Sequence, residues 1–396
     1  AHVEAPTGGS VILAGILLGP SALGLIWPVD WPVLFPKETQ QSLQLLGKIG
    51  LILLLFQVGM EFDYGHLRAR SRTVTAVSIC GIAVPFVCGL LIGPWLHREF
   101  APNAPRFGFQ LFLCIALSIS ALPIMGRILL EMKLERTAIG AMGISAAAID
   151  DVTGWVLLAV ATAVVTVGFD GWALAKQVAG VLLFFFALQK LVGPALCKVW
   201  RRVAERNGGQ GLTASFLTLL LIVLFGSALV SNRLRIFAIF GAFLLGVSLH
   251  KELSLVKAWR EKFSDFVIVA MVPIFFTNTG LNTEIGSLNT PLAWVGCGVV
   301  LLAAAAGKLG GCFVAARLTG QSPCEAACIA ALMNTRALMA LVAINIGLDL
   351  KLLNRELFTM LVIMALLTTA MTGPLLRWWL PEGLRKQAWQ ERDAKN

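Results

Sequence analysis

The chain has 396 residues, of which 57% are hydrophobic and 14% are charged, with a mean hydropathy of +0.81. A soluble domain carries about 25% charged residues, so the composition excludes a soluble globular protein and predicts an integral membrane protein. The net charge of +10 does not indicate nucleic-acid binding, because the Lys and Arg residues lie in short loops between apolar segments, as is typical of cytoplasmic loops in membrane proteins.

Twelve apolar segments are candidate membrane helices, since a spanning helix needs about 20 mostly apolar residues. The sequence therefore predicts an all-α polytopic membrane protein with twelve spans and no soluble domain in any loop. A polar tail, residues 381–396, follows the last span. The predicted spans are residues 10–27, 45–62, 73–95, 108–130, 137–167, 173–197, 212–232, 236–250, 264–282, 291–317, 324–348 and 356–380.

Loop cations predict the orientation. The loops after the even-numbered spans hold most of the Lys and Arg residues, for example Arg68, Arg70 and Arg72. Cytoplasmic loops carry such an excess, so we expect these loops, the tail and both ends of the chain to be cytoplasmic. A bacterial inner membrane is the expected location. The chain opens with Ala1 rather than Met, so we expect a further segment upstream.

The sequence predicts neither a zinc site nor a disulfide framework. Its eight cysteines are scattered through apolar segments without a Cys-x-x-Cys spacing, and its four histidines fall at or near segment ends. Cysteine in such positions behaves as a small apolar residue. No residues pair a nucleophile with a base. We therefore expect no enzyme and no cofactor.

Two adjacent aspartates, Asp150 and Asp151, interrupt the otherwise apolar span 137–167. At about 1.5 Å per residue, Asp150 lies about 20 Å into this helix, near the middle of a hydrocarbon core about 30 Å thick. A lipid-facing charge there costs at least about 2.5–3.5 kcal/mol. Neighbouring helix positions point about 100° apart, so one carboxylate can pair with a cation while the other faces a cavity.

Two regions of the chain resemble each other. One is "LFLCIALSISALPIMGRILLEMKLERTAIG" from Leu111, and the other is "EAACIAALMNTRALMALVAINIGLDLKLLNRE" from Glu325. Each has a CIA start, a polar patch in mid-span and a Lys-Leu loop. Because their spans enter the predicted fold from opposite sides, they indicate an inverted-topology repeat, which many secondary transporters share.

Each repeat carries a candidate helix break at its polar patch. Proline removes a backbone hydrogen bond, and backbone groups freed at membrane depth must face protein or a watery cavity. We expect two broken helices that cross near the midplane; two kinked but continuous helices are the alternative. The residues of these patches are Ser118, Ser120 and Pro123 in the first repeat and Asn334, Thr335 and Arg336 in the second.

Two buried cations are candidate partners for the aspartates: Lys308, among Ala and Gly in the span 291–317, and Arg336. An Asp–Lys pair at this depth can be switched by protonation or by an arriving cation. It can equally be a permanent ion pair that holds two helices together. The second aspartate has no spare partner, so a purely structural role explains it poorly.

A midplane carboxylate that water can reach binds either a proton or a small hard cation. The two cannot occupy it together, and this competition couples their movements. Oxygen atoms of Ser118, Ser120, Asn334 and Thr335 would complete the shell of the cation if the two breaks meet. Residues 277–279 form another polar stretch, which we consider a weaker candidate because it lies closer to a helix end.

At these residues the sequence resembles the monovalent cation:proton antiporter-2 family. The double aspartate is most similar to the electrogenic sodium/proton antiporters of the NapA type. The matching pieces follow the family's order along nearly the whole chain: "GILLGPSALG" (15–24), "LLLFQVGMEFD" (53–63), "SISALPIMGRIL" (118–129), "SAAAIDDVTGW" (145–155), "VPIFFTNTGL" (272–281), Lys308 and "MNTRALMALVAINIGL" (333–348).

The resemblance implies thirteen helices, one of them preceding this chain, and a homodimer. It implies a mobile ion-carrying core formed by residues 73–167 and 291–380, and a dimerisation scaffold formed by residues 1–62 and 212–282, with 173–197 connecting them. It also implies that Asp151 is the main ion-binding carboxylate, with Asp150 the partner of Lys308. Ala337 departs from the pattern, since many relatives have Gly there.

These observations predict a secondary antiporter that exchanges Na⁺, K⁺ or Li⁺ for protons by elevator-like alternating access, with a role in pH homeostasis. Two protons per cation would make the exchange electrogenic. The first alternative is a sodium-coupled symporter of an organic solute on the same inverted-repeat core. A membrane-bound sensor or channel-like module is the second, and the absence of an output domain counts against it.

Overall fold

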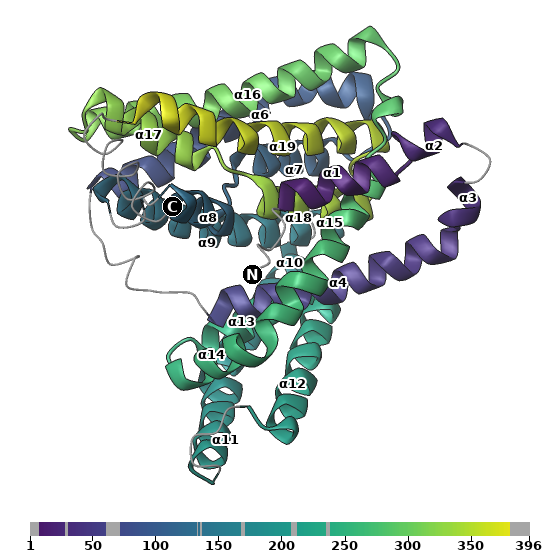
Figure 1. The fold of residues 1–396 in the computed structure, drawn as a ribbon. Coiled ribbons are helices and arrows are strands. Elements are labelled where there is room, and N and C mark those ends of the chain that lie inside the picture. Colours follow the sequence, from purple (N-terminus) through teal and green to yellow (C-terminus); the bar gives the residue numbers. More distant parts are fainter. Residues whose placement is uncertain are drawn as a thin grey trace, which may run out of the picture. The chain divides into compact units, whose positions relative to one another are not determined.

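The structure is a computed structural model of the chain, and its described residues form helices with no strand (Figure 1). Residues 8–27, 31–60, 72–132, 134, 137–167, 171–206, 212–234 and 238–380 are described. The predicted cytoplasmic tail, the loop arginines 68 and 70, and Lys133 of the first Lys-Leu loop lie outside the described residues. The chain divides into two compact units, each of which is described by itself.

Unit 1 comprises Ala1–Asp63 and Ala159–Asn282. Its most extensive helix contacts are those of α4 with α13, α1 with α15, and α12 with α13. Two π-helical segments, η2 and η3, precede α15. The helices are α1 (Gly8–Leu18), α2 (Leu23–Ile26), α3 (Trp31–Leu34), α4 (Lys37–Met60), α10 (Gly171–Ala187), η1 (Leu188–Val192), α11 (Gly193–Arg206), α12 (Ala214–Arg233), α13 (Ala238–Leu249), α14 (Leu253–Trp259), η2 (Arg260–Ser264), η3 (Phe266–Met271) and α15 (Val272–Leu281).

Unit 2 comprises Tyr64–Leu158 and Thr283–Asn396. Helix α6 packs along both α16 and α7, and α19 packs along α16, α17 and α18. The helices are α6 (Arg72–Phe100), α7 (Arg106–Ser118), α8 (Leu122–Glu131), α9 (Ala138–Val167, which continues into unit 1), the 3₁₀ turn η4 (Ile285–Ser287), α16 (Pro291–Leu318), α17 (Pro323–Met333), α18 (Ala337–Asp349) and α19 (Arg355–Trp379).

In the described part of the chain, eight helices are long and apolar enough to cross a membrane. The four other predicted spans correspond to shorter or interrupted helices, so the count of twelve stays a prediction. The helix of the predicted span 10–27 is interrupted, because α1 ends at Leu18 and a turn precedes α2. Pro20 explains this end, since proline disfavours helical backbone in the preceding residue and clashes with the preceding turn.

Several helices are longer than their predicted spans, and two of them extend through polar residues. Helix α4 begins at Lys37 rather than at residue 45, and the helix through α11 continues to Arg206 rather than ending at 197. Hydropathy marks only the apolar part of a helix, whereas Lys, Glu, Gln and Arg are good helix formers outside it. Both extensions consist largely of such residues.

Glycines allow the closest helix contacts inside each unit. In unit 1 a Cβ at Gly246 of α13 would overlap the backbone oxygen of Phe56 in α4. In unit 2 a Cβ at Gly307 of α16 would lie 3.0 Å from the Cα of Pro85 in α6. Small residues at such crossings let helix backbones approach closely, which is how membrane helices gain packing energy without a hydrophobic driving force.

We expect Gly246→Ala to destabilise unit 1, because the added methyl group forces α4 and α13 apart. Overpacking of this kind costs about 1–3 kcal/mol, and the expected result is a lower midpoint of thermal unfolding in detergent. Gly226→Ala in α12 is the matched control, since a Cβ there meets nothing within 4 Å. Equal midpoints for the two variants would contradict the tight α4–α13 contact.

Candidate functional site

Two interrupted helices of unit 2 form the centre of the candidate site. Helix α7 ends at Ser118 and α8 begins at Leu122, while α17 ends at Met333 and α18 begins at Ala337. The first break has a local cause: Pro123 cannot donate a backbone hydrogen bond, and Ile119 is extended, with φ −73° and ψ 134°. Both predicted polar patches therefore coincide with breaks rather than kinks.

The two breaks contact each other directly. The backbone N–H of Ala121 donates to the carbonyl of Thr335 at 2.9 Å. The hydroxyl of Ser120 donates to the carbonyl of Met333 at 2.8 Å. These two bonds join chain segments more than 200 positions apart, and they satisfy backbone groups that the interruptions leave without helical partners.

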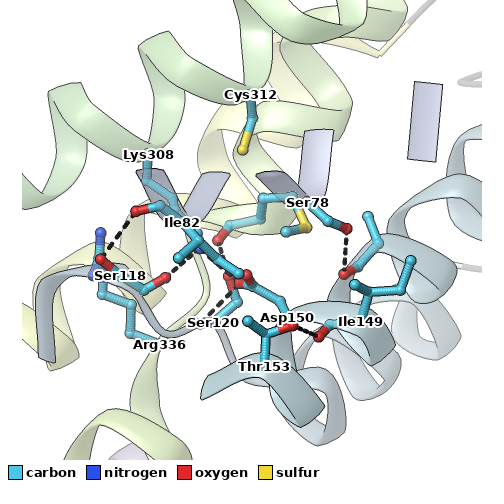
Figure 2. Close-up of polar contacts among 12 residues, drawn as sticks. Ser78, Ile82, Ser118, Ser120, Ile149, Asp150, Thr153, Lys308, Cys312 and Arg336 are labelled. Atoms are coloured by element: carbon cyan, nitrogen blue, oxygen red, sulfur yellow. Dashed lines mark hydrogen bonds and ion pairs between the residues drawn. The ribbon is translucent and has the colours of Figure 1, made fainter. Parts of the chain in front are cut away.

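A buried ion pair lies at this junction (Figure 2). The Nζ of Lys308 in α16 lies 2.7 Å from the Oδ2 of Asp150 in α9, and both side chains are 0% exposed. Lys308 also donates to the carbonyl of Ser118 at 2.5 Å, and the backbone N–H of Ser120 donates to Asp150 at 3.2 Å. The pair thus binds the end of α7 and the backbone inside the α7–α8 break.

Arg336 forms no ion pair with an aspartate in the part of the chain that the structure describes. Its fully buried guanidinium donates to the carbonyls of Leu117 and Ala116 in the last turn of α7 and, at 2.7 Å, to the carbonyl of Ala304 in α16. The carboxyl end of a helix carries partial negative charge, so Arg336 and Lys308 together neutralise the end of α7. The guanidinium is therefore bound within the protein rather than exposed.

Asp151 lies beside this pair but in different surroundings. It is 5% exposed, and the backbone N–H of Leu122, the first residue of α8, hydrogen-bonds to it. The positive end of a helix favours such an anion. Its Oδ1 has no hydrogen-bond partner. Asp150 also has an Oδ1 without a partner, but its Oδ2 is held by Lys308, whereas Asp151 has no such ion pair among the described residues.

The other predicted oxygen donors are brought to the same junction. The hydroxyl of Ser118 donates to the carbonyls of Cys114 and Ile82, and the hydroxyl of Thr335 donates to that of Leu332. Asn334 donates through Nδ2 to Thr368, and its buried Oδ1 has no partner. Asn334 is thus the residue of this group with a wholly unused acceptor. Pro123 lies in the first turn of α8.

Sequence reasoning missed two hydroxyl residues that support the site. Ser78 of α6 donates to the carbonyl of Ala146 in α9, one turn before Asp150, at 3.0 Å (Figure 2). Thr369 of α19 accepts from the backbone N–H of Arg336 at 3.2 Å. The sequence feature that could have indicated these two residues was a hydroxyl side chain within an apolar segment. The weaker candidates, residues 277–279, belong to α15 of unit 1.

The donor set suits a hard monovalent cation better than a transition metal. No group of three or more His, Cys, Asp or Glu side chains gathers in the described part of the chain. What the junction offers instead is carboxylate and amide oxygen, the ligand type of hard cations, together with helix ends that carry partial charges.

The sequence model described as "Sodium/hydrogen exchanger, transmembrane" matches residues 3–381. The chain belongs to the sodium/hydrogen exchanger family. The predicted class, a cation/proton antiporter, is confirmed by this match, which gives no support to the symporter alternative.

The chain aligns with nearly the whole of one relative but with less than half of another. The chain is 36% identical to "Na(+)/H(+) antiporter NhaS4" of Synechocystis sp. over 378 residues, which are 95% of this chain and 91% of that protein. It is 34% identical to "Cation/H(+) antiporter 20" of Arabidopsis thaliana over 92% of this chain but only 44% of that protein. The chain thus spans less than half the length of the plant relative.

A solved structure supports the fold. The sodium proton antiporter MjNhaP1 from Methanocaldococcus jannaschii aligns over 97% of this chain and 92% of its own, with a TM-score of 0.59. The two sequences are 14% identical, so this similarity concerns the fold alone.

We expect Lys308→Gln to lower the stability of unit 2 more than the double variant Asp150→Asn/Lys308→Gln. Removing one partner of a buried ion pair strands the other charge and costs about 3–5 kcal/mol, whereas replacing both partners is far less costly. Thermal unfolding of the two purified variants in detergent compares them. A double variant that unfolds at or below the midpoint of Lys308→Gln would show that the pair does not control stability.

Proposed function

We propose that the chain exchanges Na⁺, K⁺ or Li⁺ for protons across a membrane, with Asp151 as the side chain that both ions use in turn. The observation that carries this proposal is the contrast between two neighbouring carboxylates. Both have a buried Oδ1 without a hydrogen-bond partner, but Asp150 is 0% exposed and bound through Oδ2 by a buried lysine, whereas Asp151 is 5% exposed and has no ion-pair partner among the described residues.

Competition at Asp151 supplies the coupling. The backbone N–H of Leu122, at the start of α8, hydrogen-bonds to Asp151 and offsets part of the cost of burying its charge. A cation that binds the free oxygen adds to this stabilisation, and a proton that binds there removes the charge. Because one oxygen cannot hold both, loading one ion requires release of the other. Asn334 is the proposed second oxygen ligand, since its Oδ1 is free.

Asp150 and Lys308 are the proposed carriers of a second proton. An arriving cation at Asp151 places a positive charge near Lys308, which weakens the hold of the lysine on its proton. If both sites turn over, two protons move against one monovalent cation, and each cycle transfers net charge. The membrane potential then drives the exchange.

Alternating access would occur by movement of one unit. We propose that unit 2, which holds every charged residue of the site, is the ion-carrying core, and that unit 1 is the scaffold through which two copies form a homodimer. Residues 73–167 and 291–380 then move as the core. The twelve spans, the inverted repeat, cytoplasmic ends and a bacterial inner membrane complete the proposal, supported by loop charge and by the repeated sequence patterns.

Asp151→Asn is expected to abolish cation-driven proton movement in proteoliposomes, because the amide can neither take up a proton nor carry the charge that binds a cation. A pH-sensitive dye inside the vesicles measures the exchange after addition of NaCl, KCl or LiCl. Asp265→Asn, an exposed aspartate of unit 1, is the matched control and should retain wild-type rates. Substantial exchange by Asp151→Asn would reject the assignment.

Lys308→Gln is expected to remove the voltage dependence of exchange, because one of the two titrating groups is lost and one proton then moves per cation. Proteoliposomes with potassium–valinomycin potentials of either sign provide the measurement. In the wild type the initial rate should change with the potential, and in the variant it should not. The same voltage dependence in both proteins would make the Asp150–Lys308 pair structural only.

A further inference from the structure

A cavity of about 610 Å³ lies at the junction of α6 and α7 in unit 2, outside the site described above. Its walls come from the last three turns of α6, the following turn and the first residue of α7. The side chains around it combine a cationic rim with an apolar wall. The lining residues are Leu91, Pro94, Trp95, His97, Arg98, Pro102 and Arg106.

Two arginines give the rim a positive charge that the protein neutralises only in part. Arg98 contacts Glu99 at 2.9 Å, but its side chain is 76% exposed, so this pair contributes little. Arg106 is exposed and has no ion-pair partner among the described residues. It is also the first residue of α7, where the positive end of the helix adds to the local field.

The turn that presents these arginines is held in place. The ring of His97 packs against Phe109 with centroids 5.4 Å apart, and its Nε2 donates to the carbonyl of Ala104 at 2.8 Å. Trp95 packs edge-on against the buried ring of Phe100 at 5.8 Å. These contacts fix the backbone that carries the two arginines, so less conformational entropy is lost when a ligand binds.

The opposite wall is apolar and begins about 10 Å away along α6, since seven residues at about 1.5 Å each separate Leu91 from Arg98. The side chain of Leu91 is 75% exposed. Tryptophan and arginine side by side at the end of a spanning helix are typical of the membrane–water interface. One ligand class has a matching shape: a negative head group followed directly by hydrocarbon.

We propose that this cavity binds an anionic phospholipid, with the phosphate on Arg98 and Arg106 and the upper part of an acyl chain against Trp95 and Leu91. Guanidinium groups bind phosphate oxygens through paired charge-assisted hydrogen bonds. A free phosphate would use the rim but leave the apolar wall in contact with water, so the lipid uses the whole cavity.

The bound lipid would brace the hairpin that carries the ion site. Gln110 donates to the carbonyls of Gly89 and Leu90 at 3.0 and 3.1 Å, and the second of these lacks its helical donor because Pro94 has no N–H. At the far end of the same helix pair, Ser118 of α7 bonds to Ile82 of α6. A lipid that clamps the open end would stabilise the pair along its length.

The test compares Arg98→Gln/Arg106→Gln with the wild type in the presence of phosphatidylglycerol, phosphatidylcholine or glycerol phosphate. Native mass spectrometry counts bound lipids, and thermal unfolding measures stabilisation. Wild-type protein should bind phosphatidylglycerol and gain stability, and the double variant should bind it at least about tenfold more weakly, because the charge-assisted hydrogen bonds to the phosphate are lost. Arg98→Lys/Arg106→Lys should recover part of the binding, and Arg233→Gln, an exposed arginine outside the cavity, should behave as wild type.

Three results would overturn the proposal. Equal stabilisation by glycerol phosphate would assign the cavity to a soluble phosphate rather than a lipid. Equal effects of phosphatidylcholine would remove the role of the negative head group. Unchanged phosphatidylglycerol binding by the glutamine double variant would place the lipid elsewhere. None of these results depends on ion exchange, because binding is measured on Asp151→Asn protein as well as on the wild type.

Discussion

The site depends on one constraint: backbone groups at the ends of interrupted helices cannot stay without partners in a medium that lacks water. The break between α7 and α8 leaves carbonyls at one end and N–H groups at the other. Lys308 and Arg336 bind the carbonyl end, while Asp150 and Asp151 accept from the N–H end. Each buried charge therefore stabilises a helix end of opposite partial charge. The ion pair stabilises the break, and the break supplies hydrogen-bond partners for the ion pair.

Adjacent carboxylates acquire different properties from this arrangement. Asp150 and Asp151 differ by one helix position, about 100° of rotation, and this difference decides which of them meets the lysine of α16. The one that does is fully buried and held in position. The other contacts the start of α8 and has no ion-pair partner among the described residues, although each carboxylate keeps one oxygen without a hydrogen-bond partner. A carboxylate held in an ion pair and a carboxylate that can bind an exchangeable ion can thus occupy adjacent positions of one helix.

Much of this site could be predicted from the sequence, because charges and proline are conspicuous in apolar segments. Asp150, Asp151, Lys308 and both breaks were recognisable in this way. The partners of Arg336 were not, since carbonyls of α7 and α16 have no sequence signature and meet only through tertiary packing. Ser78 and Thr369 escaped notice for a related reason: a hydroxyl in a membrane helix usually bonds within its own helix, so a contact to a neighbouring helix cannot be read from one segment.

The fold shows the same division between local and distant causes. Hydropathy located the apolar cores of the long helices, and it failed where polar helix formers extend a helix or where a proline ends one, as at Lys37 and Pro20. Neither pattern indicates which helices form a compact unit. That grouping arises from close contacts between segments far apart in the chain, such as Gly307 of α16 against Pro85 of α6.

Dense packing around the ion pair has a consequence for transport. Lys308 and Asp150 have no exposed surface, a Cβ at Gly81 would lie 2.9 Å from the Sγ of Cys312, and Arg336 binds three carbonyls of two helices. Opening a path to Asp151 by rearranging these helices would break several buried hydrogen bonds, each expensive to leave unmade. Moving the whole unit past its surroundings would break none of them. The internal bonding of the site therefore favours displacement of unit 2 as a body over a gate that opens within it.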